Sequence, residues 1–236
     1  MNKIVVLNQK TYMNLDDFKD YIKVFKDKVR TDIDVIFCPS SIYLPYCSGK
    51  YSFSLGSQNL SYMDVTGEVT AEQLKSMNVR YSIIGHGERR VCLNESLNDI
   101  NKKIISALDN GITPIICLGE TKEEYSMKKT QDVIVKQIKA YLKDVDVMDD
   151  LVFAYEPIWA INTGVSISSS FIDEIVMLIK SIIYKKYGKD VKVLYGGSVN
   201  DENIISLKKS KYIDGFMIGK SSTNVEETLN ILNNLD

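Results

Sequence analysis

Three side chains with complementary chemistry each follow a short apolar run in this sequence: Lys10, His86 and Glu156. The carboxylate of Glu156 is expected to have a raised pKa beside apolar residues, which would suit a base near neutral pH. The imidazole of His86, the only histidine, and the ammonium of Lys10 could stabilise negative charge developing on a substrate oxygen. Together they suit proton abstraction beside a carbonyl group. Taken singly, they could equally be a surface lysine, a structural histidine and a packed core acid.

Two glycine-containing segments offer a place for an anion. They are residues 195–198 and 215–221, and each includes or follows another apolar run. Glycine leaves backbone N–H groups accessible and a helix N-terminus favours negative charge, although either segment alone could be a plain tight turn. The residues expected to form or support a phosphate-binding cradle are Tyr195, Gly196, Gly197, Ser198, Gly219 and Lys220.

The apolar runs themselves predict eight β-strands. The predicted strands are Lys3–Leu7, Val35–Cys38, Ser52–Gly56, Tyr81–Ile84, Thr113–Cys117, Val152–Tyr155, Val191–Leu194 and Gly215–Ile218. The runs are almost continuously apolar, as expected of parallel strands that are covered on both faces. Eight strand–helix units in 236 residues match a closed (β/α)8 barrel of the α/β class.

Helical patterns fill most of the intervals between the strands. The predicted helices are Asn14–Arg30, Glu95–Asn110, Thr121–Lys143, Ser168–Tyr187 and Glu226–Leu235. An open doubly wound sheet is the alternative, but that fold usually has a glycine-rich turn after its first strand, where this chain has Asn8-Gln9-Lys10. The barrel is therefore favoured. It would bring the carboxyl ends of all strands, and the side chains that follow them, to one rim.

The composition is that of a soluble globular protein, with 44% hydrophobic and 25% charged residues. A net charge of −2 gives no basic field for nucleic acid, and no apolar run is long enough to span a bilayer. The four cysteines form no CxxC pair, which favours free buried thiols in a reducing compartment. We therefore expect one cytoplasmic domain, residues 1–236, with no metal, cofactor, nucleic-acid partner or membrane segment.

Four segments of the chain resemble the triosephosphate isomerase family. They are IIGHGERR, AYEPIWAINTG, YGGS and DGFMIGKSS, in the family's order and at compatible spacing. The resemblance runs from Asn8 to the last predicted helix. It implies a TIM barrel that interconverts dihydroxyacetone phosphate and glyceraldehyde 3-phosphate through an enediolate, in glycolysis and gluconeogenesis, without a cofactor.

The resemblance also implies roles for individual residues. Glu156 would be the base, His86 would polarise the substrate carbonyl, and Lys10 would offset the phosphate and enediolate charge. Asn8 would bind substrate beside Lys10, and Glu88 would orient that lysine. In the family a helix N-terminus keeps the imidazole neutral, and here a helix near residue 95 or a turn at 87–89 could do so.

Several positions depart from the family's pattern. Gln9 and Gly87 stand where the family usually has Trp and Ser, and Lys220 replaces the second glycine of the cradle. Asn162, an expected substrate-binding residue of the closing loop at 157–167, replaces a glycine. The loop before Thr66 is shorter than usual; in the family this loop docks into a second subunit, so the resemblance implies a homodimer with Thr66 at the contact.

Two other functions fit the same residues. One is the isomerisation of four-carbon ketose phosphates on the same barrel, motivated by the altered closing loop and cradle. The other is an inactive barrel that acts as a binding protein, although such a protein would have no physical reason to keep Lys10, His86 and Glu156 together.

Overall fold

A closed barrel of eight parallel strands forms the centre of the computed structural model, which describes residues 2–49, 51–146, 151–161 and 167–235. Each strand pairs with the next, and β8 closes the barrel against β1. The strands are β1 Lys3–Asn8, β2 Ile33–Cys38, β3 Ser54–Ser57, β4 Tyr81–Ile84, β5 Thr113–Leu118, β6 Val152–Tyr155, β7 Lys192–Tyr195 and β8 Gly215–Ile218. The predicted (β/α)8 barrel is thereby confirmed, with three strands at their predicted bounds and the other five shifted by one or two residues.

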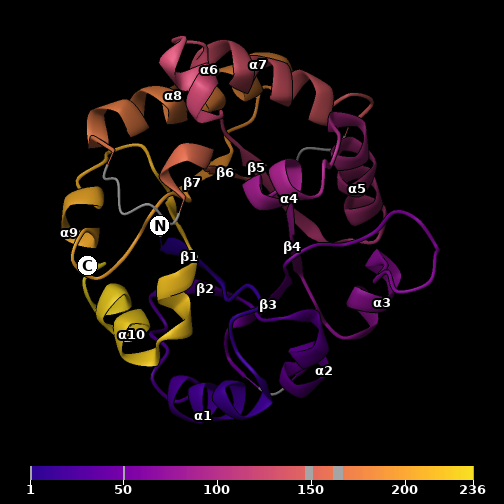
Figure 1. Cartoon of the computed structure of the whole chain (residues 1–236), viewed down its shortest axis with the longest axis vertical. Coiled ribbons are helices and arrows are strands. Elements are labelled where there is room, and N and C mark those ends of the chain that lie inside the picture. Colours follow the sequence, from indigo (N-terminus) through magenta and orange to yellow (C-terminus); the bar gives the residue numbers. More distant parts are fainter. Residues whose placement is uncertain (1, 50, 147–150, 162–166, 236) are drawn as a thin grey trace.

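Helices surround the barrel, as the end-on view in Figure 1 shows. The α-helices are α1 Leu15–Phe25, α2 Leu44–Cys47, α3 Ala71–Ser76, α4 Gly87–Cys92, α5 Leu97–Asp109, α6 Lys122–Ser126, α7 Thr130–Tyr141, α8 Ser169–Tyr187, α9 Ile204–Leu207 and α10 Val225–Asn233. Short 3-10 turns lie at η1 Ser41–Tyr43, η2 Ile158–Ala160 and η3 Lys220–Thr223. Polar caps begin many of the helices; Asn14, for example, caps α1 as its sequence predicts.

One predicted helix, Thr121–Lys143, is wrong as a single element. The structure divides it into α6 and α7, with Lys128 in a left-handed conformation (φ 58°) between them. An L-residue in that conformation cannot continue an α-helix, so the chain changes direction there. The break separates Tyr125 on α6 from the long packed face of α7.

Two layers of apolar side chains explain why the strands read as continuous apolar runs. Val6 and Ile36 belong to a small cluster made up largely of strand residues, whereas Val5 and Leu7 belong to a larger one shared with the surrounding helices. Successive side chains of a strand point to opposite faces, so alternate residues fill the barrel interior and the helix-facing shell.

No helix among the described residues is long and apolar enough to cross a membrane. Of the four free cysteines, Cys92 is exposed, so the expectation of buried thiols is wrong at this position; the other three are buried.

Candidate active site

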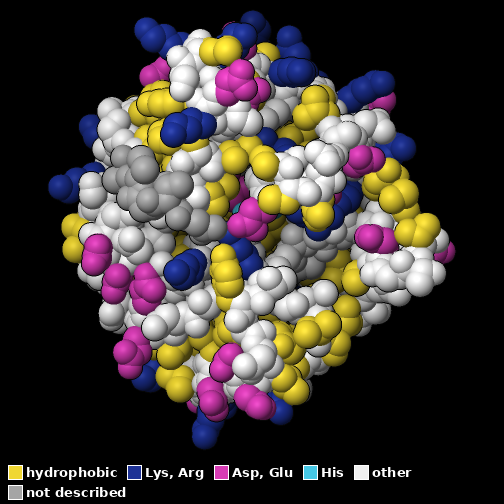
Figure 2. Space-filling view, in the orientation of Figure 1, with side chains coloured by type: hydrophobic (Ala, Val, Ile, Leu, Met, Phe, Trp, Pro, Cys, Tyr) yellow, Lys and Arg dark blue, Asp and Glu magenta, His cyan; other side chains and the backbone are white. Residues whose placement is uncertain are grey.

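Lys10, His86 and Glu156 lie together at the carboxyl ends of β1, β4 and β6. All three are buried, with 9%, 6% and 1% of their surface exposed. They line one cavity of about 300 Å³, together with Asn8, Ile161, Gly196, Gly197, Ser198, Val199, Asn200, Met217, Gly219, Lys220, Ser221 and Glu227. In the same orientation as Figure 1, Figure 2 shows acidic and basic side chains next to one another around the middle of this face.

His86 and Glu156 are in direct contact. Nε2 of His86 lies 3.2 Å from Oε1 of Glu156, and Nδ1 of His86 accepts a hydrogen bond from the Glu88 backbone N–H at 3.2 Å. A nitrogen that accepts cannot carry the proton, so the proton of the neutral imidazole is on Nε2, facing Glu156 and the cavity. His86 is the N-cap of α4, so the helix at Gly87–Cys92, rather than one near residue 95, supplies the N–H.

The charges of the pair change one expectation from the sequence. Burial raises the pKa of Glu156, as expected, but the charge and hydrogen bond of His86 outweigh it, so the pKa is lowered. Burial likewise lowers the pKa of His86, and the Glu156 carboxylate outweighs it, so that pKa is raised. The predicted raised pKa of Glu156 is therefore wrong, because the sequence does not show that an imidazole touches the carboxylate.

The ammonium of Lys10 forms an ion pair with Glu88. The Lys10 backbone is left-handed, with φ of 50°, a conformation that L-residues seldom adopt. Side chains on both sides hold it there: Gln58 donates to the Lys10 carbonyl at 2.8 Å, and Asn8 Oδ1 accepts from the Lys10 N–H at 3.3 Å. The ion pair with Glu88 and the held backbone together fix the direction of the Lys10 ammonium.

Two glycines make room for Glu156. A Cβ at Gly119 would lie 1.9 Å from the Glu156 carbonyl oxygen, and one at Gly196 would lie 2.7 Å from its Cγ. The Glu156 N–H donates to the Leu118 carbonyl at 2.7 Å, which continues the β5–β6 ladder past the strand end. Glu156 is therefore held by backbone on both sides.

The expected cradle lines the same cavity. Gly196, Gly197 and Ser198 follow β7, and Gly219 and Lys220 follow β8. Tyr195 is buried beneath them, and a Cβ at Gly197 would lie 2.1 Å from its hydroxyl oxygen, so only glycine fits there. Accessible N–H groups at this position of a barrel suit a phosphate.

Two further residues were expected at the site. Asn162 lies outside the described residues. Thr66 is exposed on the loop before α3, next to a second cavity of about 670 Å³ that shares Lys10 and His86 and is also lined by Gly67 and Leu93.

Comparisons with known proteins agree with this geometry. The model of the family described as "Triosephosphate isomerase" matches residues 3–235. Triosephosphate isomerases of Alkaliphilus metalliredigens and Mycoplasmopsis pulmonis are 37% and 36% identical to the chain, each alignment covering 98% of both proteins. The crystal structure of triosephosphate isomerase from Bartonella henselae superposes with a TM-score of 0.90 at 26% identity, covering 99% of each chain.

The chain belongs to the triosephosphate isomerase family.

Two departures from the usual triosephosphate isomerase pattern have a structural explanation. The Gln9 side chain donates to the Ser222 carbonyl at 3.2 Å and so ties β1 to η3 behind the cradle. A Cβ at Gly87 would lie 3.0 Å from Cδ1 of Ile161 and 3.3 Å from Cγ1 of Ile158. Glycine at 87 therefore lets the chain after Glu156 pack against the start of α4.

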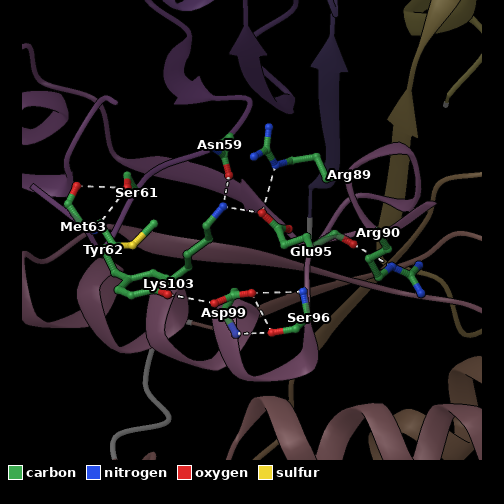
Figure 3. A network of polar contacts seen from close by, with 11 residues as sticks. Asn59, Ser61, Tyr62, Met63, Arg89, Arg90, Glu95, Ser96, Asp99 and Lys103 are labelled. Atoms are coloured by element: carbon green, nitrogen blue, oxygen red, sulfur yellow. Dashed lines mark hydrogen bonds and ion pairs between the residues drawn. The ribbon is translucent and has the colours of Figure 1, made fainter. Parts of the chain in front are cut away.

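A polar network, shown in Figure 3, holds α4 in place. Glu95 accepts from Arg89 of α4 at 3.0 Å and pairs with Lys103 of α5, whose ammonium also donates to Asn59 at 2.8 Å. Arg90 donates to the carbonyls of Gly85 and Gly119 at 2.9 and 2.8 Å. The helix that orients His86 is thus tied to three neighbouring segments.

Sequence reasoning missed several residues at the site, including Val199 and Asn200 in the cavity wall. Ile161, Met217 and Glu227 also line the cavity. The Cys117 thiol interacts with Glu156, and burial together with this carboxylate raises the pKa of the thiol well above its usual value. Met217 and Cys117 lie inside apolar strands, and Glu227 lies in the first turn of a helix, so nothing in the pattern separates them from core or surface. Among the described residues, no group of three or more His, Cys, Asp or Glu side chains could hold a metal ion.

Proposed function

We propose that the protein interconverts dihydroxyacetone phosphate and glyceraldehyde 3-phosphate, as its relatives' names imply, in glycolysis and gluconeogenesis. The observation that carries the proposal is one cavity that joins a buried carboxylate, an imidazole, a fixed ammonium and a glycine cradle. This set matches a small substrate with a carbonyl at one end and a phosphate at the other.

The proposed reaction begins with the phosphate on the N–H groups of Gly197 and Gly219, near the ammonium of Lys10. Glu156 removes a proton from the carbon beside the carbonyl. The Nε2–H of His86 and the ammonium of Lys10 stabilise the oxygen that becomes negative in the enediolate. The hydroxyl proton on the first carbon's oxygen then moves to the oxygen of the former carbonyl, a transfer that the His86 imidazole can relay. Glu156 returns its proton to the carbon of that former carbonyl, and the two transfers together convert ketose to aldose.

The imidazole becomes a better neutral donor as the reaction proceeds. Burial lowers the pKa of His86, but the charge on Glu156 outweighs it and raises the pKa, and that charge disappears when Glu156 takes up the substrate proton. The Glu88 N–H aimed at Nδ1 opposes a second proton throughout.

The direct test is a coupled assay of the purified protein with dihydroxyacetone phosphate, glyceraldehyde 3-phosphate and an erythrulose phosphate. We expect the highest kcat/KM with the trioses. A higher value with the four-carbon substrate would favour the alternative isomerase, and no turnover of any of them would favour a binding protein.

We also propose that the chain is a single cytoplasmic domain that forms a homodimer. In support, the family match extends over residues 3–235, and the loop carrying Thr66 exposes Met63 and Val65 next to the cavity that shares Lys10 and His86. A loop of a second copy would fill that cavity and bury these apolar side chains. No nucleic-acid or membrane partner is part of the proposal.

A further inference from the structure

The only tryptophan of the chain, Trp159, lies three residues after the base, in η2. Its indole N–H donates to Oε1 of Glu120 at 2.9 Å. Glu120 is fully buried, and its carboxylate also accepts from the Tyr155 hydroxyl at 3.2 Å. The indole is therefore one of the donors that satisfy a buried carboxylate next to β6, so its position matters to the strand that ends in Glu156.

The outer face of the indole is covered by Tyr125 of α6. The two rings stack with their centroids 4.2 Å apart and an interplanar angle of 29°. Tyr125 is in turn contacted edge-on by Phe171 in the first turn of α8, at 5.9 Å and 86°. Both geometries are favourable for aromatic pairs.

This three-ring cluster, Trp159–Tyr125–Phe171, joins segments that no strand pairing connects. Trp159 precedes residues 162–166 and Phe171 follows them, so Tyr125 contacts the chain on both sides of that interval. The same turn carries Ile158 against Gly87 and leads directly to Ile161 in the wall of the active-site cavity.

We propose that Tyr125 is a positioning residue for the reaction: its ring fixes the Trp159 indole, and through η2 it sets the placement of Glu156 and Ile161. Tyr125 touches no substrate. It holds η2 from outside while Glu120 holds it from the barrel side. The proposal rests on the proposed isomerase activity only for its kinetic consequence, because the position of the indole can be measured without substrate.

The test compares Tyr125→Leu, which removes the stack, with Tyr125→Phe, which keeps the ring and removes only the hydroxyl. Tyr184→Leu, at an exposed tyrosine on α8, is the matched control. Trp159 is the sole tryptophan, so intrinsic fluorescence reports on this one site. We expect Tyr125→Leu to shift the emission to longer wavelength and to lower kcat/KM about two- to tenfold, mostly in kcat, while Tyr125→Phe and Tyr184→Leu match the unmodified protein. Phe171→Leu should give a smaller change in the same direction.

Unchanged emission and kcat/KM in Tyr125→Leu would overturn the proposal, even if its melting temperature fell, because the ring would then serve stability alone. An equal loss in Tyr125→Phe would also overturn it, since the hydroxyl rather than the stack would be responsible. If the unmodified protein had no isomerase activity, the proposed function would fail while the fluorescence comparison would still decide whether Tyr125 holds the indole.

Discussion

Glu156, the proposed base, lies where its carboxylate cannot exchange protons freely with water. It is 1% exposed, touches His86 and is enclosed by the backbone of Gly119 and Gly196. We expect Glu156→Gln to lower kcat at least about 10³-fold with little change in KM, because the amide cannot accept the substrate proton but fills the same volume. Steady-state kinetics and a circular dichroism melt would check this. Near-normal turnover in a folded Glu156→Gln protein would remove this residue from the chemistry.

Lys220 and Glu227, which carry opposite charges, both line the active-site cavity. If the Lys220 ammonium reaches the substrate phosphate, Lys220→Gly should raise KM and the inhibition constant of inorganic phosphate about two- to fivefold, as for an exposed ion pair. Glu227→Gln removes a repulsive carboxylate and should shift both constants the other way. Competitive inhibition by phosphate measures the two effects directly. If neither variant changes it, both side chains point away from the bound anion.

At the scale of the elements, the barrel closes where β8 meets β1, and Gly215 is at the contact. A Cβ there would lie 1.8 Å from the Ile4 carbonyl oxygen, whereas a Cβ at Gly219, just past the end of the same strand, meets Lys10 Cε at 3.5 Å. Gly215→Ala should therefore destabilise the fold by about 3 kcal/mol, because two backbones must separate, and Gly219→Ala should cost far less. Urea unfolding followed by circular dichroism would compare them. Equal stabilities would contradict the close approach.

Asp214, just before β8, joins that end of the strand to β7 and α8 through its carboxylate. Burial raises the pKa of its carboxyl, but Lys180 at 2.7 Å, the Val193 N–H at 2.9 Å and Lys192 at 3.3 Å outweigh it, so the pKa is lowered. A group whose pKa is lower in the folded state stabilises above its unfolded pKa, and this contribution disappears as pH falls through the folded value. Melting temperatures measured from pH 7 to pH 3 should fall less steeply in Asp214→Asn. Parallel curves would show that Asp214 does not contribute.

Elements and site residues differ in how far the sequence predicts them. The strands were predictable because both of their faces are buried, which produces a continuous apolar run in the sequence. The long helices were predictable because one face of each is apolar. The break in the helix at Lys128 could not be predicted, because a lysine gives no sign of a left-handed backbone. The sequence also predicts that Glu156 and His86 lie at one rim of the barrel. It does not predict that they are 3.2 Å apart, and this contact decides the direction of the Glu156 pKa shift.

At the scale of the whole molecule, exposed apolar side chains beside the second cavity lead us to expect association with a second copy of the chain. Val65 and Leu93 are 55% and 63% exposed, and the cavity shared with Lys10 and His86 lies beside their segments. Analytical ultracentrifugation should give about twice the chain mass of 26.7 kDa at micromolar concentration. Val65→Asp should shift the protein toward monomer and lower activity with it, because it would bury an unpaired charge in the contact.

The control for this prediction is Tyr184→Asp, which places the same charge on an exposed position of α8. It should leave both mass and activity unchanged. A protein that sediments as a monomer, or a dimer indifferent to Val65→Asp, would show that the loop before α3 is not the contact.

The left-handed backbone at Lys10 has a consequence for how the protein can be improved. Holding a non-glycine residue there costs on the order of 1–2 kcal/mol of folding free energy, a cost that glycine would not incur. Selection for heat resistance alone would therefore favour loss of the very ammonium on which the proposed chemistry depends. Variants selected for higher stability therefore have to be assayed for turnover as well, because the residue that favours stability at position 10 is not the residue that the proposed catalysis requires.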